Sequence, residues 1–301
     1  MNDFILHTKS YAPDVEQCKR CIESIEKPNK DNIPVYISVP KSDFQLFKDK
    51  LGTLNYELVA DEDSFVVKHV DGWRGQQIVK THINKLNICK NYLCLDSDSV
   101  FINDFYKSDF MADKDVVYTV MQEPMDIVLH NEVVKKAPNG YYKIDFFRTV
   151  RDIRKILGNE DFVKLYLFGH PPYAWNCDVW TKIQDFFAEN NMNMEQFFMW
   201  FEQQTGAISR ECVIYGEFLL KTQMINVYPT ASWFKSVTSE AIYNFDCQIG
   251  VDTGFIKRHY LGIAIQDGRS TREKGITWNS EMSPKLIQQL KDDPNTYQRR
   301  F

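Results

Sequence analysis

Two aspartates separated by one residue are the sharpest chemical feature of the sequence. Asp96 and Asp98 directly follow the apolar run Tyr92–Leu95. In an extended segment residues two apart point the same way, so both carboxylates can face one point. Like charges this close repel unless a cation joins them, and Mg²⁺ typically takes one or two carboxylates and completes its shell with phosphate oxygens and water. The motif therefore predicts a Mn²⁺ or Mg²⁺ site that also holds substrate phosphates. The simpler alternative is a polar turn that caps a strand.

Two other segments carry cations that could join this site. Arg74, Gln77 and Lys80 are spaced three apart on a predicted helix, opposite its apolar face. A solvated face is the simple interpretation, but cations near the carboxylates would suit a diphosphate, which Arg and Lys bind. His259 is flanked by basic residues, and Gly262 after it allows close backbone approach. His259 could complete the metal shell, or it could be a structural histidine.

An alternation of strand and helix patterns positions these residues. Strands are expected at Phe4–His7, Val35–Val39, Tyr56–Val59 and Tyr92–Leu95. Helices are expected from Asp14, around Phe44 to Leu51, and from Trp73 to Leu86. This order predicts an α/β fold with an open, mostly parallel, Rossmann-like sheet flanked by helices. Ligands bind beyond the carboxyl ends of the strands in such sheets, and the two aspartates lie there.

The remainder of the chain is less regular and shows no interdomain linker. The region from about 122 to 205 is rich in aromatic and amphipathic patterns and predicts a helical insertion whose rings lie mainly in the core. Short strands are expected after Phe218–Leu220, and 263–301 is expected to be a polar tail. We therefore expect a single domain over residues 1–301.

Composition excludes several classes of protein. The chain of 301 residues has a net charge of −5, so the basic field of a generic nucleic-acid binder is missing. No apolar stretch is long enough for a transmembrane helix, and the first residues lack the pattern of a signal peptide. The seven cysteines include Cys18 and Cys21, whose spacing favours buried helical neighbours over a metal or redox site. Reduced thiols indicate a cytoplasmic protein, either free or peripheral to a membrane.

These motifs resemble those of GT-A-fold glycosyltransferases, which use nucleotide-sugar donors. Asp96-Ser97-Asp98 matches the Asp-x-Asp metal motif, and Lys257–Gly262 resembles the Lys-x-x-His-x-x-Gly of glycogenin-like transferases. Gly72–Lys80 and Arg210–Glu217 resemble segments of a bacterial and phage branch of poorly defined function. The resemblance implies a GT-A fold, with 1–105 as the nucleotide-sugar-binding half and 106–262 as the acceptor-side half.

The resemblance also implies a function and a site. The protein would be a metal-dependent hexosyltransferase that moves a sugar from a donor such as UDP-glucose to a hydroxyl of a glycan, lipid-linked or other acceptor. The metal ligands would be Asp96, Asp98 and His259. The donor-binding residues would be Thr8, Lys9, Tyr11, Asp61, Arg74, Gln77, Lys80 and Ser97.

Roles on the acceptor side stay open between alternatives. An inverting reaction needs a carboxylate base, for which Glu211 comes first, Glu217 second and Asp178 third, whereas a retaining reaction needs none. The rings expected to line the acceptor cleft, unless they belong to the core, are those of His170, Trp175 and Trp233.

Other classes fit part of the pattern. The segment Tyr92–Val100 also resembles the first motif of haloacid-dehalogenase-like phosphatases, in which Asp96 would be the nucleophile and Asp98 a general acid with Mg²⁺. That family needs a downstream aspartate pair after an apolar strand, and the pair Asp292-Asp293 lies in a polar tail. A nucleotidyltransferase would carry a glycine-rich loop that Thr8–Tyr11 lacks. A non-catalytic sugar-nucleotide or glycan-binding protein is the remaining class.

Overall fold

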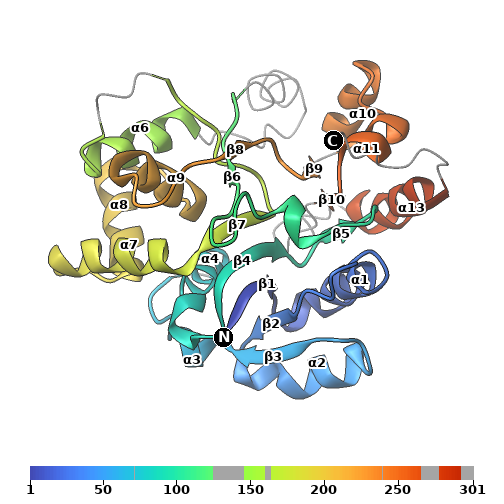
Figure 1. Ribbon diagram of the computed structural model, residues 1–301, viewed down its shortest axis with the longest axis horizontal. Coiled ribbons are helices and arrows are strands. Elements are labelled where there is room, and N and C mark those ends of the chain that lie inside the picture. Colours follow the sequence, from blue (N-terminus) through green and yellow to red (C-terminus); the bar gives the residue numbers. More distant parts are fainter. Residues whose placement is uncertain (71, 125–145, 160–163, 239, 266–277, 293–301) are drawn as a thin grey trace.

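The centre of the molecule is a mostly parallel β-sheet. The computed structural model describes residues 1–70, 72–124, 146–159, 164–238, 240–265 and 278–292. Its five-stranded sheet has the order β3-β2-β1-β4-β7, in which β7 runs antiparallel to β4 and the other neighbours run parallel (Figure 1). The strands are β1 (Asn2–Lys9), β2 (Val35–Val39), β3 (Glu57–Ala60), β4 (Cys89–Asp96) and β7 (Tyr173–Asn176). The expected α/β class, with an open sheet flanked by helices, is confirmed.

Alternate residues of the strands enter two hydrophobic cores, one on each face of the sheet. Phe4 and Leu6 of β1 join one core and Ile5 joins the other. Helices α1 (Val15–Glu26) and α2 (Phe44–Leu51) pack into the first core. The helices of the second core are α4 (Gly72–Thr81), α6 (Phe146–Ile156), α7 (Cys177–Glu189), α8 (Met194–Thr205) and α9 (Glu211–Thr222). Burial on both faces explains why the strands read as continuous apolar runs.

A smaller sheet continues from the end of β4. Its order is β5-β10-β9, with β5 (Ser99–Phe101), β10 (Gly262–Ile265) and β9 (Phe234–Val237). The helices beside it are α10 (Glu240–Gln248), α11 (Thr253–His259) and α13 (Trp278–Asp292), which lie on the opposite side of the molecule from α6 to α9 (Figure 1). The pair β6 (Thr119–Val120) and β8 (Pro229–Thr230) forms a short parallel ladder. A short helix, α3 (Asp61–Ser64), follows β3.

Three expectations about the elements differ from the structure. The helix expected from Trp73 to Leu86 ends as α4 at Thr81, and a separate 3₁₀ turn follows it. The expected loop from Thr8 begins later, because β1 continues to Lys9. The described part of the tail is not simply polar, since α13 places Leu286 and Leu290 in the core beneath the smaller sheet. Residues 266–277 and 293–301 lie outside the described part of the chain.

The interpretation of Cys18 and Cys21 as buried helical neighbours is confirmed. Both thiols are free and lie fully buried on α1. Burial raises the pKa of Cys18 to about 12, so its thiolate is not available near neutral pH.

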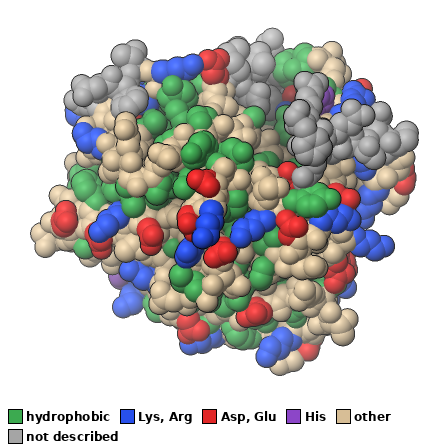
Figure 2. Space-filling model, in the orientation of Figure 1, with side chains coloured by type: hydrophobic (Ala, Val, Ile, Leu, Met, Phe, Trp, Pro, Cys, Tyr) green, Lys and Arg blue, Asp and Glu red, His purple; other side chains and the backbone are tan. Residues whose placement is uncertain are grey.

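Within the described residues, no helix has both the length and the apolar character needed to cross a bilayer. On the face seen in Figure 2, acidic and basic side chains are interspersed.

Candidate active site at the carboxyl edge of the sheet

Charged residues gather where the parallel strands end. Lys9 ends β1 and is the register partner of Asp96, which ends β4. Asp61 directly follows β3 in the chain. Because parallel strands end at the same edge of a sheet, the three side chains share one edge, where ligands bind in open α/β folds.

An ion pair joins α4 to the end of β4. Lys80 lies in the last turn of α4 and is only 3% exposed, and its Nζ donates to Oδ1 of Asp96. Burial alone would lower the pKa of Lys80, but the charges of Asp96, Cys94 and Glu211 and the hydrogen bond to Asp96 together outweigh burial, so the net result is a raised pKa. Lys80 is therefore a permanent cation at the acidic turn.

The helix face that carries Lys80 is not solvated. Gln77 and Lys80 are both buried against neighbouring elements, so the simple interpretation of this face is wrong for these two residues. Arg74 is directed elsewhere, because its Nη2 donates to both carboxylate oxygens of Glu202 on α8 at 2.6 Å. The structure thus brings Lys80, but not Arg74, to the aspartate.

A second buried ion pair lies beside the first. Lys9 Nζ lies 2.8 Å from Oδ2 of Asp61. Burial lowers the pKa of Lys9 and raises the pKa of Asp61, and in each case their mutual attraction only partly offsets it. Oδ1 of Asp61 is buried without a hydrogen-bond partner in the described structure. Buried polar atoms normally have partners, so a donor group of a ligand could complete the contacts of this carboxylate.

The other residues expected to bind the nucleotide-sugar donor, Thr8, Tyr11 and Ser97, have different surroundings. Thr8 is fully buried, with its Oγ1 3.9 Å from Sγ of Cys21, so it faces α1 rather than the edge. Tyr11 is half-buried at the start of the turn that leads into α1. Ser97 is half-buried between the two aspartates.

Glu211 is a buried carboxyl group near the Lys80–Asp96 pair. It is the first residue of α9, is 6% exposed, and its backbone N–H donates to Oε1 of Gln77 at 3.3 Å. Burial raises the pKa of Glu211, with the charge of Lys80 opposing and that of Asp96 adding to the effect. Nε2 of Gln77 and Nε of Arg210 are buried here without partners in the described structure. A carboxyl with a raised pKa beside unpaired donors is suited to proton transfer.

The other two carboxylates named as possible bases lie elsewhere. Glu217 is 0% exposed and binds Nε and Nη2 of Arg154 at 2.9 and 2.7 Å, which links α9 to α6. Asp178 is exposed in the first turn of α7. It follows Asn176, whose partner on β4 is Asn91, near the end opposite to Asp96. The structure brings neither residue to the acidic turn.

The acidic turn offers two of the three expected metal ligands. Asp96 and Asp98 are both half-buried, and the charges of both contribute to the raised pKa of Cys21. In the parts of the chain that the structure describes, no three His, Cys, Asp or Glu side chains come together as a metal site. Two carboxylates and substrate phosphate oxygens are nevertheless a common ligand set for Mg²⁺, so the turn fits a divalent ion held in that way.

The strand register explains why His259 is not with the aspartates. Gly262 pairs with Phe101, three residues past Asp98. At about 3.3 Å per strand residue, Gly262 lies roughly 10 Å along the strand from Asp98, and His259 precedes it. A Cβ on Gly262 would lie 2.6 Å from the carbonyl oxygen of Val100, so the missing side chain serves strand packing rather than ligand approach.

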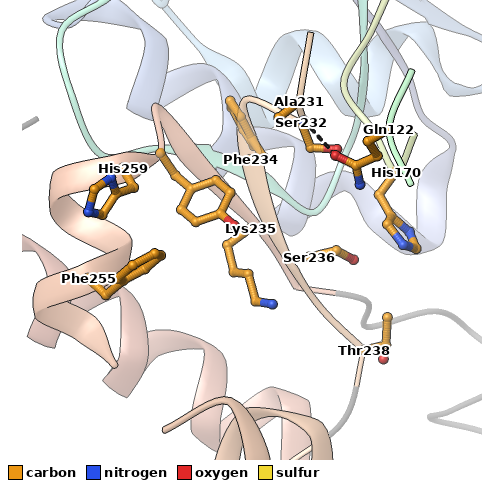
Figure 3. Close-up of a pocket in the computed structure, with 11 residues that line it drawn as sticks. Gln122, His170, Ala231, Ser232, Phe234, Lys235, Ser236, Thr238, Phe255 and His259 are labelled. Carbon is orange, nitrogen blue, oxygen red and sulfur yellow. Dashed lines mark hydrogen bonds between the residues drawn. The ribbon is translucent and has the colours of Figure 1, made fainter. Parts of the chain in front are cut away.

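A cavity of about 230 Å³ opens between β9, α11 and the segment before β7 (Figure 3). The polar and titratable side chains that line it include Gln122, His170, Lys235, Ser236, Thr238 and His259. His170 therefore lines a cavity, and its role on the acceptor side stays a prediction. Lys235 and Ser236 belong to no sequence motif, because a four-residue strand is too short to show a pattern.

The two tryptophans expected at the acceptor cleft belong to the core. Trp175 is 2% exposed and stacks on Tyr173 with ring centroids 4.9 Å apart. Trp233 is buried, and its Nε1 donates to the carbonyl oxygen of Asp109 at 2.9 Å. The alternative that these rings are structural is the one that the structure supports.

Comparison with known proteins gives a family and a distant structural likeness. No curated protein matches the sequence. The crystal structure of mouse xyloside xylosyltransferase 1 in its apo form is similar at a TM-score of 0.48 and 8% identity, over 88% of this chain and 98% of that chain. A family model matches residues 3–164, which span β1 to β4, the acidic turn and the helices between them. On that match the chain belongs to DUF6492, a family of unknown function.

Proposed function

We propose that this protein is a metal-dependent glycosyltransferase that moves a sugar from a nucleotide-sugar donor to a hydroxyl acceptor. The observation that carries the proposal is the Lys80–Asp96 ion pair with the buried carboxyl of Glu211 beside it. Transfer of a sugar from a diphosphate requires stabilisation of the leaving group and, in an inverting reaction, a base. One edge of the sheet offers a fixed cation, two carboxylates able to share a metal, and a carboxyl group able to act as the base.

The donor would lie along the edge from β3 toward β7. Its nucleoside would meet the Lys9–Asp61 pair, where Oδ1 of Asp61 can accept from an N–H group of a base. Its diphosphate would lie over Asp96 and Asp98, next to the ammonium of Lys80. A uridine diphosphate sugar such as UDP-glucose is the first candidate, from the resemblance to GT-A-fold transferases.

Charge on the departing diphosphate has to be stabilised as the sugar leaves. A divalent ion held by Asp96 and Asp98 supplies Lewis-acid stabilisation of the phosphate oxygens when it is bound. Lys80 stays protonated through the reaction, because the charge of Asp96 raises its pKa. Its ammonium orients the diphosphate by donating to phosphate oxygens in addition to Asp96.

The acceptor hydroxyl has to lose a proton if the reaction inverts. Glu211 would accept it, since its raised pKa gives the carboxylate more basicity than an exposed glutamate has. Gln77 holds the first turn of α9 in place through the backbone N–H of Glu211. In a retaining reaction Glu211 would instead contribute charge next to the sugar.

Calorimetry of nucleotide-sugar binding tests this proposal. We expect a UDP-sugar to bind in the presence of Mn²⁺, and Asp96→Asn to weaken that binding at least tenfold. Asp178→Asn is the matched control, because it removes one exposed carboxylate near the opposite end of β4 and should leave the affinity unchanged. Equal affinities of the wild type and Asp96→Asn, or no binding by any nucleotide sugar in a panel, would contradict the proposal.

The two other classes predict different products. A haloacid-dehalogenase-like phosphatase with Asp96 as nucleophile would hydrolyse a generic aryl phosphate. The second aspartate pair that it needs is not on a strand, since Asp292 ends α13 and Asp293 lies outside the described residues. A non-catalytic sugar-nucleotide or glycan-binding protein would bind the donor and never release free sugar from it. Release of sugar to water, even slowly, distinguishes the transferase from both.

A further inference from the structure

The cavity beside β9 lies two strands away from the acidic turn, and none of the expected donor-binding residues lines it. The backbone N–H of Ile265 donates to the carbonyl oxygen of Asp98 at 3.2 Å, and Ile265 pairs with Val237 on β9. Two strand spacings therefore separate Asp98 from β9, which is roughly 10 Å. Thr238, which lines the cavity, directly follows Val237.

The other wall of the cavity also begins near the turn. Tyr173, the first residue of β7, pairs with Cys94, two residues before Asp96. Because β7 runs antiparallel to β4, the chain before Tyr173 extends toward the Asp96 end, and His170 lies in that segment. The cavity therefore lies next to the place where we put the donor diphosphate, on the side away from the Lys9–Asp61 pair.

The lining of the cavity is rich in hydrogen-bond donors. Figure 3 shows Lys235 extending from β9 between Phe255 and Thr238, with the imidazoles of His170 and His259 on opposite walls. The ammonium of Lys235 lies 2.9 Å from Asp246 and keeps further protons to donate. None of the described residues that line the cavity is acidic.

Two hydroxyls in the described lining lack a hydrogen-bond partner, those of Ser232 and Ser236. Ser236 is 9% exposed, and its Oγ is buried without a hydrogen bond in the described structure. In Figure 3 this side chain lies between Lys235 and His170. Lys235 and Ser236 line the same cavity from opposite sides of β9. A ligand oxygen in the cavity would give the Ser236 hydroxyl the hydrogen bond that it lacks.

We propose that this cavity binds the acceptor through an anionic group, a carboxylate or a phosphate carried by a sugar. That the ligand is an acceptor rests on the proposed transferase function. That the ligand is anionic rests on the cavity alone. Lys235 and Ser236 contact the anionic group, and His170 and His259 flank the sugar that carries it. The acceptor hydroxyl then points toward the acidic turn.

Binding of small sugars without any donor tests the anion site. The probes are D-glucuronate, D-glucose 6-phosphate and D-glucose, measured by ligand-observed NMR against the full-length protein. We expect one or both anionic sugars to bind at least tenfold more tightly than glucose, and the two anionic probes separate a carboxylate site from a phosphate site. Glucose binding as tightly as both of them overturns the proposal.

Variants assign the binding to the cavity. Ser236→Ala and Lys235→Gln should weaken the binding of the anionic sugar at least threefold and tenfold, respectively. Arg258→Gln is the matched control, because Arg258 is exposed beside His259 and does not line the cavity. Circular dichroism checks that Lys235→Gln folds, and the milder Ser236→Ala carries the test if it does not. Unchanged affinity in a folded cavity variant overturns the proposal.

Donor turnover separates this inference from the proposed function. In Ser236→Ala we expect transfer to an anionic acceptor to show a raised KM, while slow hydrolysis of the donor by water is unchanged. Loss of both activities together, or competition between the anionic sugar and the nucleotide for one site, overturns the separate acceptor cavity. Anion binding that depends on Lys235 in a protein that turns over no donor supports the cavity and contradicts only the transferase.

Discussion

Lys9 and Asp96 occupy paired positions at the ends of the neighbouring strands β1 and β4. Each is bound by a residue of opposite charge from another element, Lys9 by Asp61 and Asp96 by Lys80. Two ion pairs therefore lie next to each other at one edge of the sheet, with the cation of one pair, Lys9, beside the anion of the other, Asp96. This arrangement balances the buried charge in the free protein and leaves cations in place for a diphosphate.

Replacement of Lys80 should destabilise the protein, because the partly buried carboxylate of Asp96 then lacks its cationic partner. Removing one partner of a buried pair costs about 3–5 kcal/mol, but the side chain of Asp96 is 29% exposed and water recovers part of that. We therefore expect Lys80→Met to lower the free energy of unfolding by about 1–3 kcal/mol in urea titrations. The double variant with Asp96→Asn should regain part of the loss. A Lys80→Met protein as stable as the wild type would show that the pair contributes nothing.

Glu211 should make stability depend on pH. Its pKa in the folded protein is raised above the ordinary carboxyl value of 4.5, mainly by burial. Between that value and the raised one, the folded state binds more protons than the unfolded state, so stability falls as pH rises through this window. Glu211→Gln removes the titration, so its melting temperature should exceed that of the wild type at pH 8 and converge with it near pH 4. A variant that is less stable than the wild type at pH 8 would contradict a buried, ionised Glu211.

Glu217 should be important for stability and not for chemistry. It is fully buried and bound by two nitrogens of Arg154, so removing either partner leaves an unpaired buried charge. We expect Arg154→Met to lower the free energy of unfolding by about 3–5 kcal/mol. Glu211→Gln should abolish turnover by an inverting enzyme without that loss. Denaturant titrations and turnover per folded molecule, measured together, separate the two glutamates, and a fully stable Arg154→Met would contradict the structural role.

The cysteines should differ sharply in reactivity. Cys247 is half-buried, whereas Cys18, Cys21, Cys89, Cys94, Cys177 and Cys212 are buried. Burial raises the pKa of Cys18 to about 12 and also that of Cys212 to about 12, which suppresses their thiolates. A thiol reagent such as Ellman's reagent should modify Cys247 first in the native protein and all seven only after unfolding. Rapid native modification in a Cys247→Ser variant would contradict the buried positions.

The parallel half of the fold could be predicted from the sequence because burial on both faces leaves a direct signal. Val35–Val39 is apolar except for Ser38, and the structure has β2 over the same residues. The end of α4 could not be predicted in this way, because the apolar spacing continues through Ile83 after the helix has stopped. Local patterns predict what is buried, but not where a helix stops when the next turn is buried too.

The candidate site shows a similar division. Asp96 was predictable because it directly follows a buried strand, and strand ends are fixed by local sequence. The burial of Lys80 was not, since it depends on the packing of α4 against elements distant in the chain. The separation of His259 from Asp98 follows from the antiparallel register of β10 on β5, which the spacing of the motif does not contain. Lys235 and Ser236 line their cavity because they lie on β9, a strand too short to be predicted from the sequence pattern.

A crystal structure with Mn²⁺ and UDP bound would show directly whether the acidic turn is the donor site. We expect the metal between Asp96 and Asp98, the diphosphate within hydrogen-bonding distance of Lys80, and the base next to Asp61. An empty acidic turn, with the Lys80–Asp96 pair intact and the nucleotide bound elsewhere, would contradict it.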